Sequence, residues 1–399
     1  MKNSGVEWIG EIPDEWEVSK IGQLYEERRT KVSDTVYPPL SVTMQGILPQ
    51  LETAAKSDAH DDRKLVLKGD FAINSRSDRR GSCGISEFDG SVSLINTVLH
   101  PKTEMNPIYY NWLFHSFRFS DEYYKNGHGI VDDLWTTSWT EMKKIFIPLP
   151  PKSTQQRIAS YLDKKCSKIE ETIQNQQQVI EKLKTYKQSL ITEAVTGKIK
   201  IQNGKVCGKY QSYKDSGVEY LGKIPSNWNI KRLRYIGKCQ NGISKGGEFF
   251  GSGYPFVSYG DVYNNLTLPE TVSGLIESTP EEQENYSVTA GDIFFTRTSE
   301  TIEEVGFTSV CLKTIEKATF AGFVIRVRPF TEELVPDYSK YYFSSDAHRR
   351  FFVKEMNLVT RASLSQDLLK RLPILIPSKE KQKEIADYLD KNAQPSTPP

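Results

Sequence analysis

The feature that most constrains this chain is an internal repeat. Residues 4–13, SGVEWIGEIP, return 212 positions later at residues 216–225 as SGVEYLGKIP. A second pair of segments matches at residues 158–164, IASYLDK, and residues 385–391, IADYLDK. Such self-similarity indicates repeated folding units. We therefore predict two copies of one unit, with matching boundaries and divergent interiors.

Each unit is expected to combine short strands with helices. Short β-rich runs bounded by Gly, Pro, Asn and Asp predict strands, and an aromatic stretch predicts a helix. The expected fold class is therefore α/β (α+β), with a mixed β-sheet and helices in each unit. Expected strands cover 70–74, 92–99, 292–297 and 320–327, and expected helices cover 19–29, 107–117, 231–239 and 336–343. Divergent interiors favour two modules that recognise different targets, with drift after duplication as the alternative.

Residues 153–197 lie between the two units, and their pattern predicts one long amphipathic helix. Two seven-residue series of apolar or small residues interleave in it, as at the a and d positions of a coiled coil. The series are Ala159, Cys166, Ile173, Ile180 and Ala194, and Leu162, Ile169, Leu183 and Leu190. At 1.5 Å per residue, about 40 residues form a rod of roughly 60 Å, which needs a partner helix to cover its apolar face. The alternative is a core helix of a globular bundle.

Composition limits the class of protein. With 399 residues, 37% of them hydrophobic and 26% charged, the chain is long enough for two or three soluble domains. No run approaches the roughly 18 apolar residues of a membrane span, and the N-terminus lacks a signal-peptide pattern, so we expect a cytoplasmic protein without a membrane partner. Five scattered cysteines and five histidines without metal-ligand spacing predict neither a disulfide framework nor a metal site.

Three features together resemble the specificity subunit of type I restriction-modification enzymes. They are the repeated opening segment, the junction at residues 147–163, and the helix end at residues 190–199, LITEAVTGKI. The resemblance implies two target-recognition domains, each reading one half of a bipartite double-stranded DNA site, and two antiparallel helices that fix the gap between the halves. It also implies a non-catalytic subunit without a cofactor of its own. Its family partners are methyltransferase (modification) subunits, which use S-adenosylmethionine, and restriction (translocase/nuclease) subunits, which use ATP and Mg.

On this basis the chain divides into six segments. They are a first target-recognition domain (1–152), a long spacer helix (153–197), a linker (198–214), a second target-recognition domain (215–377), the start of a second helix (378–392) and a disordered tail (393–399). Proline stops helix propagation, and the tail is rich in it, so we expect the second helix to be truncated. The spacer helix could then pair either with a second copy of the chain, by self-association, or with a partner subunit.

Reading DNA requires donors and acceptors at groove edges and cations at phosphates. Because the net charge is only +1, we expect these groups in local patches or on partner subunits. In the first unit two basic groups and a glycine-flanked tip fall where loops are expected. The candidates are Arg28, Arg29 and Lys31, then Asn74, Arg76, Arg79 and Arg80, and finally His128. The alternative for each is a solvated loop without a binding role.

In the second unit a glycine-rich loop and several polar segments carry the candidates. Glycine lets the backbone approach a phosphate closely, but the loop lacks the residue order of a nucleotide-binding P-loop. Arg297 follows a Gly-Asp turn that matches Gly69-Asp70, and it aligns with Ser75, one position before Arg76. The full set is Ser244, Lys245, Tyr259, Arg297, Thr298, Ser299, Thr360 and Arg361.

Enzymatic functions have little support in the sequence. Glu141 and Lys143 follow Asp132 and Asp133 with the residue types of a nuclease metal site, but such triplets are common by chance. No N-P-P-[YF] methylation motif and no G-x-S-x-G elbow occurs. We therefore predict a non-catalytic, DNA-reading subunit. The alternatives are a coiled-coil interaction scaffold without DNA reading and a stand-alone nuclease or methyltransferase.

Overall fold

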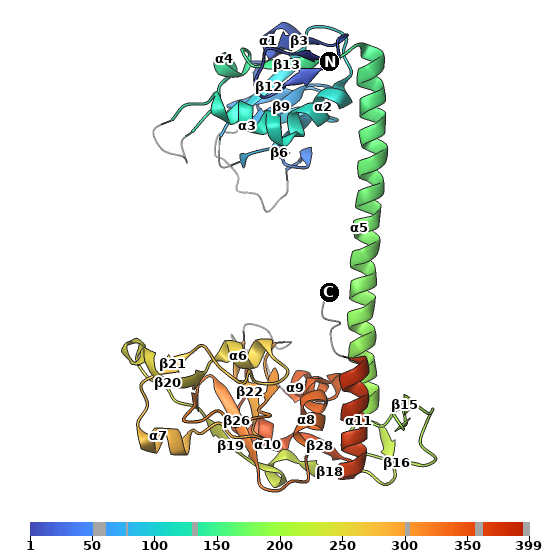
Figure 1. Ribbon diagram of the computed structural model, residues 1–399, viewed down its shortest axis with the longest axis vertical. Helices are drawn as coiled ribbons and strands as arrows, with labels where there is room; N and C mark the ends of the chain where they lie inside the picture. The colour runs from blue at the N-terminus through green and yellow to red at the C-terminus, as the bar shows by residue number, and fades with distance from the viewer. Residues whose placement is uncertain (51–60, 77–78, 130–134, 300–303, 356–361, 394–399) are drawn as a thin grey trace. The chain divides into compact units, whose positions relative to one another are not determined.

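The computed structural model contains two compact units, which divide at Asn175 and Gln176 within the long helix (Figure 1). It describes residues 1–50, 61–76, 79–129, 135–299, 304–355 and 362–393. Each unit carries one domain of strands and helices, and both domains follow one plan. The predicted fold class, two similar mixed domains separated by a long helix, is confirmed.

In the first unit the core is a four-stranded antiparallel sheet in the order β10-β9-β12-β4. Its central strand β9 (Phe71–Asn74) is buried along its whole length. Because side chains alternate across a strand, Phe71 and Ile73 join an aromatic core on one face, while Ala72 packs with Val98 on the other. The neighbouring strands are β4 (Tyr25–Glu27), β10 (Cys83–Ile85) and β12 (Asn96–Pro101).

The second unit repeats this sheet in the order β24-β22-β26-β19. Its central strand β22 (Ile293–Thr296) is also fully buried, with Ile293 and Phe295 in one core and Phe294 in another. The neighbouring strands are β19 (Gly237–Asn241), β24 (Thr308–Val310) and β26 (Val324–Pro329). The shared strand order and alternation confirm the repeat in three dimensions.

An aromatic helix pair packs on each sheet (Figure 1). The pairs are α2 (Pro107–His115) with α3 (Phe117–Lys125), and α8 (Pro336–Ser344) with α9 (Asp346–Glu355). The ring centroids of Phe71 and Phe114 lie 4.5 Å apart, and those of Phe295 and Phe343 lie 5.3 Å apart. These contacts lock the first helix of each pair onto its central strand.

The expected helices at 19–29 and 231–239 are wrong. Each segment forms one helical turn, α1 (Ile21–Leu24) or η3 (Leu233–Tyr235), and then enters an edge strand, β4 or β19. Pairing with β12 and β26 gives these strands backbone hydrogen bonds that an isolated segment lacks. Tertiary pairing therefore overrides the local preference for a helix.

The strands next to the repeated boundary segments pair with each other. β3 (Glu17–Lys20), which follows the first opening segment, runs antiparallel to β13 (Phe146–Leu149), which precedes the long helix. β18 (Asn229–Arg232) and β28 (Pro373–Ile376) repeat this pair in the second unit. The ends of each copy thus form one structural junction, which explains why the copies match best at their boundaries.

Smaller elements extend the sheets and close the loops. In the first unit they are β1 (Lys2–Asn3), β2 (Glu11–Ile12), β5 (Lys31–Val32), β6 (Leu40–Thr43), β7 (Gly46–Pro49), β8 (Arg63–Val66), β11 (Gly90–Val92) and α4 (Trp139–Met142). In the second unit they are β14 (Ile201–Gln202), β15 (Lys205–Val206), β16 (Tyr213–Asp215), β17 (Lys223–Pro225), η4 (Gly247–Phe249), β20 (Phe250–Val257), α6 (Tyr259–Asn264), β21 (Leu275–Ile276), α7 (Pro280–Asn285), β23 (Thr298–Ser299), β25 (Thr319–Phe320), β27 (Ala362–Ser363) and α10 (Gln366–Arg371).

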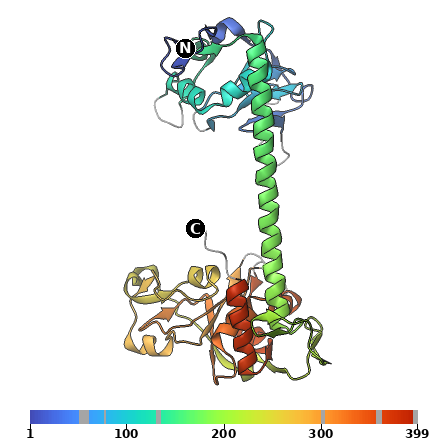
Figure 2. The same ribbon diagram turned by 45° about the vertical axis from the view of Figure 1, so that its right-hand side comes forward.

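The long helix α5 (Lys152–Val195) is continuous over 44 residues. In the second unit its last turns lie beside α11 (Lys379–Asn392), as Figures 1 and 2 show. Leu190 and Ala194 of α5 share one core with Leu389 of α11. Ala393, the first residue of the expected tail, is buried in the same core, and residues 394–399 lie outside the described residues.

The middle of α5 carries an apolar stripe that faces solvent. Seven large side chains along it are between 48% and 65% exposed. Ile169, Ile173, Ile180 and Leu183 belong to the predicted a and d series, whereas Tyr161, Val179 and Tyr186 lie outside it. The described part of the chain therefore leaves the predicted coiled-coil face open over this stretch.

Candidate nucleic-acid interface

The two domains share a polar edge at the end of the central strand. In the first domain Arg76 follows β9 and forms a β-bridge with Thr136. In the second domain Thr298 follows β22 and pairs with Ser363. Each edge therefore places the residues after the central strand beside the segment that leads into a short helix, α4 or α10.

Arg297 lies at the second edge, where its backbone is held by two hydrogen bonds. Its backbone is fixed, because its N–H donates to the carbonyl of Phe323 at 2.9 Å and its carbonyl accepts from Leu364 at 2.7 Å. Among the described residues, none pairs with its side chain. A fixed backbone, with a guanidinium that no described residue engages, suits bidentate hydrogen bonding to a ligand. Two other predicted residues, Thr360 and Arg361, lie outside the described residues.

Three further predicted residues gather beside Arg297. The Tyr259 hydroxyl donates to the Thr298 carbonyl at 2.9 Å, and Ser299 Oγ donates to Glu304 Oε2 at 2.9 Å. Burial raises the pKa of Tyr259, so its phenol stays a hydrogen-bond donor at neutral pH. The structure thus brings this predicted set together at one edge.

An aromatic ladder continues from Tyr259. Tyr263 stacks on Tyr259 with ring centroids 5.8 Å apart and planes at 21°, and Phe307 stacks on Tyr263 at 5.0 Å and 25°. The Arg349 guanidinium lies 5.2 Å from the Phe307 ring centroid. Sequence reasoning missed these three residues. Tyr263 has a signal, its spacing of four from Tyr259 on one helix face, whereas Phe307 and Arg349 come from distant segments.

The first edge is basic. Arg76 is exposed, and in the described part of the chain its side chain has no partner. Tyr124 joins it to Arg80, because the tyrosine hydroxyl donates to the Arg76 carbonyl at 3.2 Å and the Arg80 guanidinium lies 4.9 Å from the ring centroid. His128 is exposed and bridges Thr136, the residue that also bridges Arg76. Three predicted residues therefore meet at this edge.

Two predicted residues of the first domain are engaged in internal contacts. Arg28 donates to both carboxylate oxygens of Asp70, at 2.6 and 3.1 Å, and this hydrogen bonding raises the pKa of Arg28. Asn74 is buried, and its Oδ1 accepts from the Arg76 N–H at 3.0 Å. Both side chains shape the domain at the base of the edge.

Three other predicted cations of the first domain lie on the surface. Arg29 is 2.7 Å from Glu27, and Lys31 is 2.5 Å from Asp62. The Lys31–Asp62 pair is exposed on both sides, and such pairs are weak and exchange readily for another anion, whereas the Glu27 side chain of the Arg29 pair is only 11% exposed. Arg79 is exposed at the edge itself.

The glycine-rich loop of the second domain is packed internally. Lys245 Nζ donates to Glu282 Oε2 at 2.7 Å and to a backbone carbonyl at 2.8 Å, so its charge is paired inside the domain. A Cβ at Gly242 would lie 2.1 Å from the Phe320 carbonyl oxygen, so close strand packing requires this glycine. Ser244 is exposed beside the loop.

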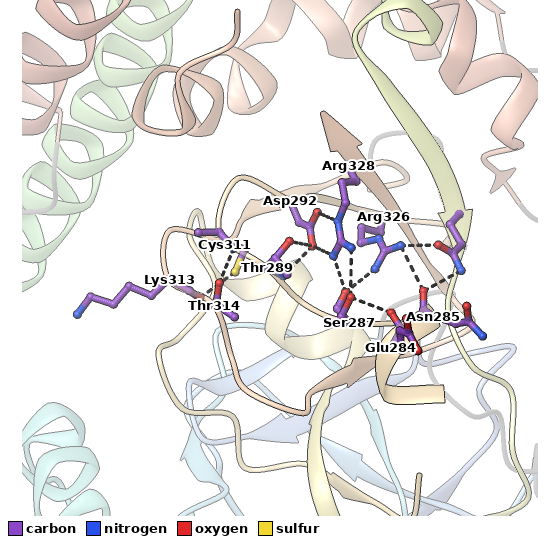
Figure 3. A network of polar contacts seen from close by, with 12 residues as sticks. Glu284, Asn285, Ser287, Thr289, Asp292, Cys311, Lys313, Thr314, Arg326 and Arg328 are labelled. Carbon is purple, nitrogen blue, oxygen red and sulfur yellow. Dashed lines mark hydrogen bonds and ion pairs between the residues drawn. The ribbon is translucent and has the colours of Figure 1, made fainter. Parts of the chain in front are cut away.

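A network of arginines fixes the outer part of the second domain (Figure 3). Arg328 donates to Asp292 through two hydrogen bonds of 2.7 and 2.6 Å and to the Ser287 carbonyl at 2.9 Å. Arg326 donates to the same carbonyl and to Gln240 Oε1. Burial lowers the pKa of Arg326 to about 10, which leaves it charged at neutral pH. These two cations therefore hold the fold together.

The chemistry of both edges is that of binding. They present guanidinium groups, hydroxyls and aromatic faces, which hydrogen-bond to bases, pair with phosphates and stack. Within the described ranges, no group of three His, Cys, Asp or Glu residues is placed to hold a metal ion. No helix in those ranges is long and apolar enough to cross a membrane.

Residues 13–182 and 225–394 each match the type I restriction modification DNA specificity domain. The chain belongs to the type I restriction-modification DNA specificity family. Each matched segment covers one of the two target-recognition domains together with part of a helix that borders it, and the protein is a specificity subunit of this family. The family predicted from the sequence is thereby confirmed.

Known specificity subunits share part of the sequence. Over 249 residues the chain is 25% identical to the EcoKI specificity subunit of Escherichia coli K12, a match that covers 60% of the chain and 49% of that relative. Over 393 residues it is 23% identical to the MjaVIII specificity subunit of Methanocaldococcus jannaschii, which covers 95% of the chain and 86% of that relative. The match thus spans about half the length of the Escherichia coli relative.

Two solved structures share the fold of this specificity subunit. One comes from work on complex assembly and conformational transition of the type I R-M system, and it gives a TM-score of 0.68 at 16% identity, covering 96% of this chain and 90% of that one. The other is the HsdS subunit from Thermoanaerobacter tengcongensis, with a TM-score of 0.52 at 17% identity, covering 95% and 89%.

Proposed function

We propose that this specificity subunit gives a type I restriction-modification complex its DNA sequence preference. Each target-recognition domain reads one half of a bipartite double-stranded site. One observation carries the proposal: the same polar edge occurs in both domains, but with different side chains. Arg76 lies in a basic patch in the first domain, whereas Arg297 lies beside hydroxyls and aromatic rings in the second. A shared frame with different side chains is what two different half-sites require.

The first edge contacts DNA mainly through cations. Arginine pairs bidentately with guanine, and any exposed cation attracts phosphate. The proposed contacts are Arg76, Arg79, Arg80 and His128 at the edge, with Arg29 and Lys31 at phosphates. Arg28 and Asn74 support the edge through their internal hydrogen bonds.

The second edge combines hydrogen bonding with stacking. The proposed contacts are Arg297, Thr298, Ser299 and Tyr259, the exposed Ser244, and the ladder residues Tyr263, Phe307 and Arg349. Lys245 supports the neighbouring loop, and Thr360 and Arg361 stay predictions from the sequence. Stacking of a base on an aromatic ring contributes about 1–3 kcal/mol, so a ladder can add affinity without a large net charge.

The exposed stripe of α5 docks methyltransferase subunits. Contiguous apolar side chains on a surface mark an interaction site, and this stripe is wide open in the chain alone. The docked subunits use S-adenosylmethionine, and restriction subunits that use ATP and Mg join through them. The same stripe supports self-association of two copies when methyltransferase is absent.

We also propose functional boundaries for the chain. The recognition domains comprise residues 1–152 and 215–377, the spacer comprises residues 153–197, and residues 198–214 form a linker. Residues 378–392 begin the second helix. The protein acts in the cytoplasm, where its DNA and its partners meet.

The alternative is a coiled-coil scaffold that binds proteins without reading DNA, and the exposed α5 stripe alone is compatible with it. The two functions separate in one retention experiment. The chain, the methyltransferase subunit and their mixture are each passed over immobilised DNA that carries the methylated site or a scrambled site. We expect site-specific retention of the mixture only, whereas a scaffold assembles without retaining the site. Activity of the purified chain alone with Mg or S-adenosylmethionine would instead indicate an enzyme.

A further inference from the structure

A buried glutamine joins the first recognition domain to the start of α5. Gln155 is only 2% exposed, and its Nε2 donates to the Pro150 carbonyl at 2.9 Å. Its Oε1 accepts from the Asn106 N–H at 3.2 Å, just before α2. One side chain thus connects the helix, the closing strand and the domain.

The second domain repeats this joint. Gln382 at the start of α11 is fully buried, and its Nε2 donates to the carbonyls of Pro377 at 2.9 Å and Glu333 at 2.8 Å. Its Oε1 accepts from the Val335 N–H at 2.8 Å, just before α8. Burying an amide side chain is costly unless it is hydrogen-bonded. The recurrence of a buried glutamine at this position in both domains therefore indicates that the joint between domain and helix requires it.

A second contact lies eight residues further along each helix. Trp112 Nε1 donates to Asp163 Oδ1 at 2.7 Å in the first domain, and the Tyr341 hydroxyl donates to Asp390 Oδ1 at 2.6 Å in the second. Eight residues are about two helical turns, so the glutamine and the aspartate share one helix face. The glutamine and the aspartate therefore both fasten the domain to its helix, and the exposed Lys152–Glu104 and Asn106–Gln156 contacts of the first domain lie beside the glutamine.

The two domains differ in what else holds them. The second domain also binds the last turns of α5: the Tyr338 hydroxyl donates to the Val195 carbonyl at 3.1 Å, and Gln188 donates to the Ser344 carbonyl at 2.9 Å. Leu190 of the same turns lies in the domain core. In the first domain Tyr109 occupies the position of Tyr338, and its hydroxyl has no partner among the described residues. Among the described residues, the helix contacts of the first domain are those with the first turns of α5.

We propose that Gln155 and Asp163 are positioning residues that set the gap between the two DNA half-sites. The inference rests on the proposed function, and it adds which contacts fix the register of reading. Successive base pairs are about 3.4 Å apart, so a small swing of the first domain on α5 moves its edge to the next base pair. The contacts of Gln155 and Asp163 prevent that swing, while the second domain keeps its position through both helices.

The test maps methylated sites in DNA from cells that express the chain with its methyltransferase partner. The variant Gln155→Leu/Asp163→Ala is compared with the matched control Gln382→Leu/Asp390→Ala in the second domain, which removes a partner of both Tyr341 and Lys340. Wild type is expected to methylate sites of one gap length. The first variant is expected to methylate additional sites with a gap one base pair different, at a tenth or more of the wild-type frequency and with both half-site sequences unchanged. The control is expected to keep one gap.

Single substitutions test the same contacts without disturbing the domain core. Asp163 is exposed, so Asp163→Ala keeps the domain core intact and is expected to add a weaker second gap. Asp163→Asn still accepts from Trp112 and is expected to restore the single gap.

Each outcome bears on the inference separately from the proposed function. Reduced methylation at one unchanged gap means that the residues serve stability only, and it overturns the inference. A second gap in the control as well as in the variant also overturns it. If wild type itself methylates no bipartite site, the proposed function fails instead.

Discussion

Asp70 and Asp292 occupy equivalent positions in the two domains, yet the arginines that donate hydrogen bonds to them come from different strands. Asp70 pairs with Arg28 at the end of β4, and Asp292 pairs with Arg328 on β26, the counterpart of β12. Both carboxylates are buried, and in both pairs the distance from the arginine nitrogen to the aspartate oxygen is 2.6 Å. A buried carboxylate needs a cation beside it, but the frame allows that cation to come from either of two adjacent strands.

This pairing predicts the cost of removing one arginine. Arg328→Met leaves the Asp292 carboxylate buried without its cation, so we expect a loss of about 3 kcal/mol in the free energy of unfolding of the second domain. Asp292→Asn removes the charge but keeps an acceptor for Arg328, so its loss is expected to be smaller. Urea unfolding of the full chain measures both, and a larger loss for Asp292→Asn would argue against this explanation.

His348 makes the second domain sensitive to acid. Burial lowers the pKa of His348 to about 3, with a contribution from the Arg349 charge. Below about pH 6.5 the unfolded chain binds a proton that the folded domain does not, so stability falls as the pH falls from 6.5 towards 3, by up to about 1.4 kcal/mol per pH unit. We expect His348→Leu to flatten the pH dependence of urea unfolding in this window. An unchanged slope would show that another group is responsible.

The aromatic ladder predicts a contribution to DNA affinity. We expect Tyr263→Ala to weaken binding of the methyltransferase complex to its site by about 1–3 kcal/mol, which is about fivefold to 160-fold, because one stacking surface is lost. The matched control is Tyr235→Ala, since Tyr235 is 62% exposed and stacks on Arg234 away from the ladder. Fluorescence anisotropy measures both affinities, and equal effects of the two changes would remove the ladder from the interface.

The balance of charges predicts how binding depends on salt. With a net charge of +1, the chain alone is expected to bind DNA weakly and with little site preference, whereas the complex with methyltransferase binds tightly. Arg76→Gln is expected to lower the salt slope of the complex by about one if the arginine contacts phosphate. The control Lys238→Gln removes an exposed charge outside both edges. Nanomolar site-specific binding by the isolated chain at physiological salt would contradict the expectation.

The exposed stripe of α5 predicts the site of assembly. Ile173→Glu and Ile180→Glu each place a charge on a side chain that is about half exposed, so the helix content seen by circular dichroism is expected to stay unchanged. Assembly with methyltransferase, or of two copies, is expected to be lost in light scattering. The control Gln178→Glu adds the same charge outside the a and d series. Equal behaviour of all three variants would place the docking surface elsewhere.

The sequence is sufficient to predict the repeat, the fold class and the long helix. Boundary segments such as residues 4–13 keep their pattern because they form a junction within their own domain, and the heptad series of α5 follows from local periodicity. The predicted helix at residues 19–29 is wrong for the opposite reason. Its strand β4 exists only through pairing with β12, which lies about 70 residues away.

The candidate site is only partly visible in the sequence. Arg297 and Arg76 follow from their place after a matched strand, which local pattern reveals. That Arg28 pairs with Asp70 and that Lys245 pairs with Glu282 depends on contacts between distant segments, so charge alone does not separate a binding cation from a structural one. Phe307 and Arg349 join the ladder by tertiary packing and leave no local signal.

The most direct test of two independent reading domains is an exchange of residues 20–140 for the interior of another family member, followed by mapping of methylated sites in cells that also express the methyltransferase subunit. We expect one half of the bipartite site to change and the other half, with the gap, to stay as in wild type. A change in both halves would contradict the division of DNA reading between the two domains.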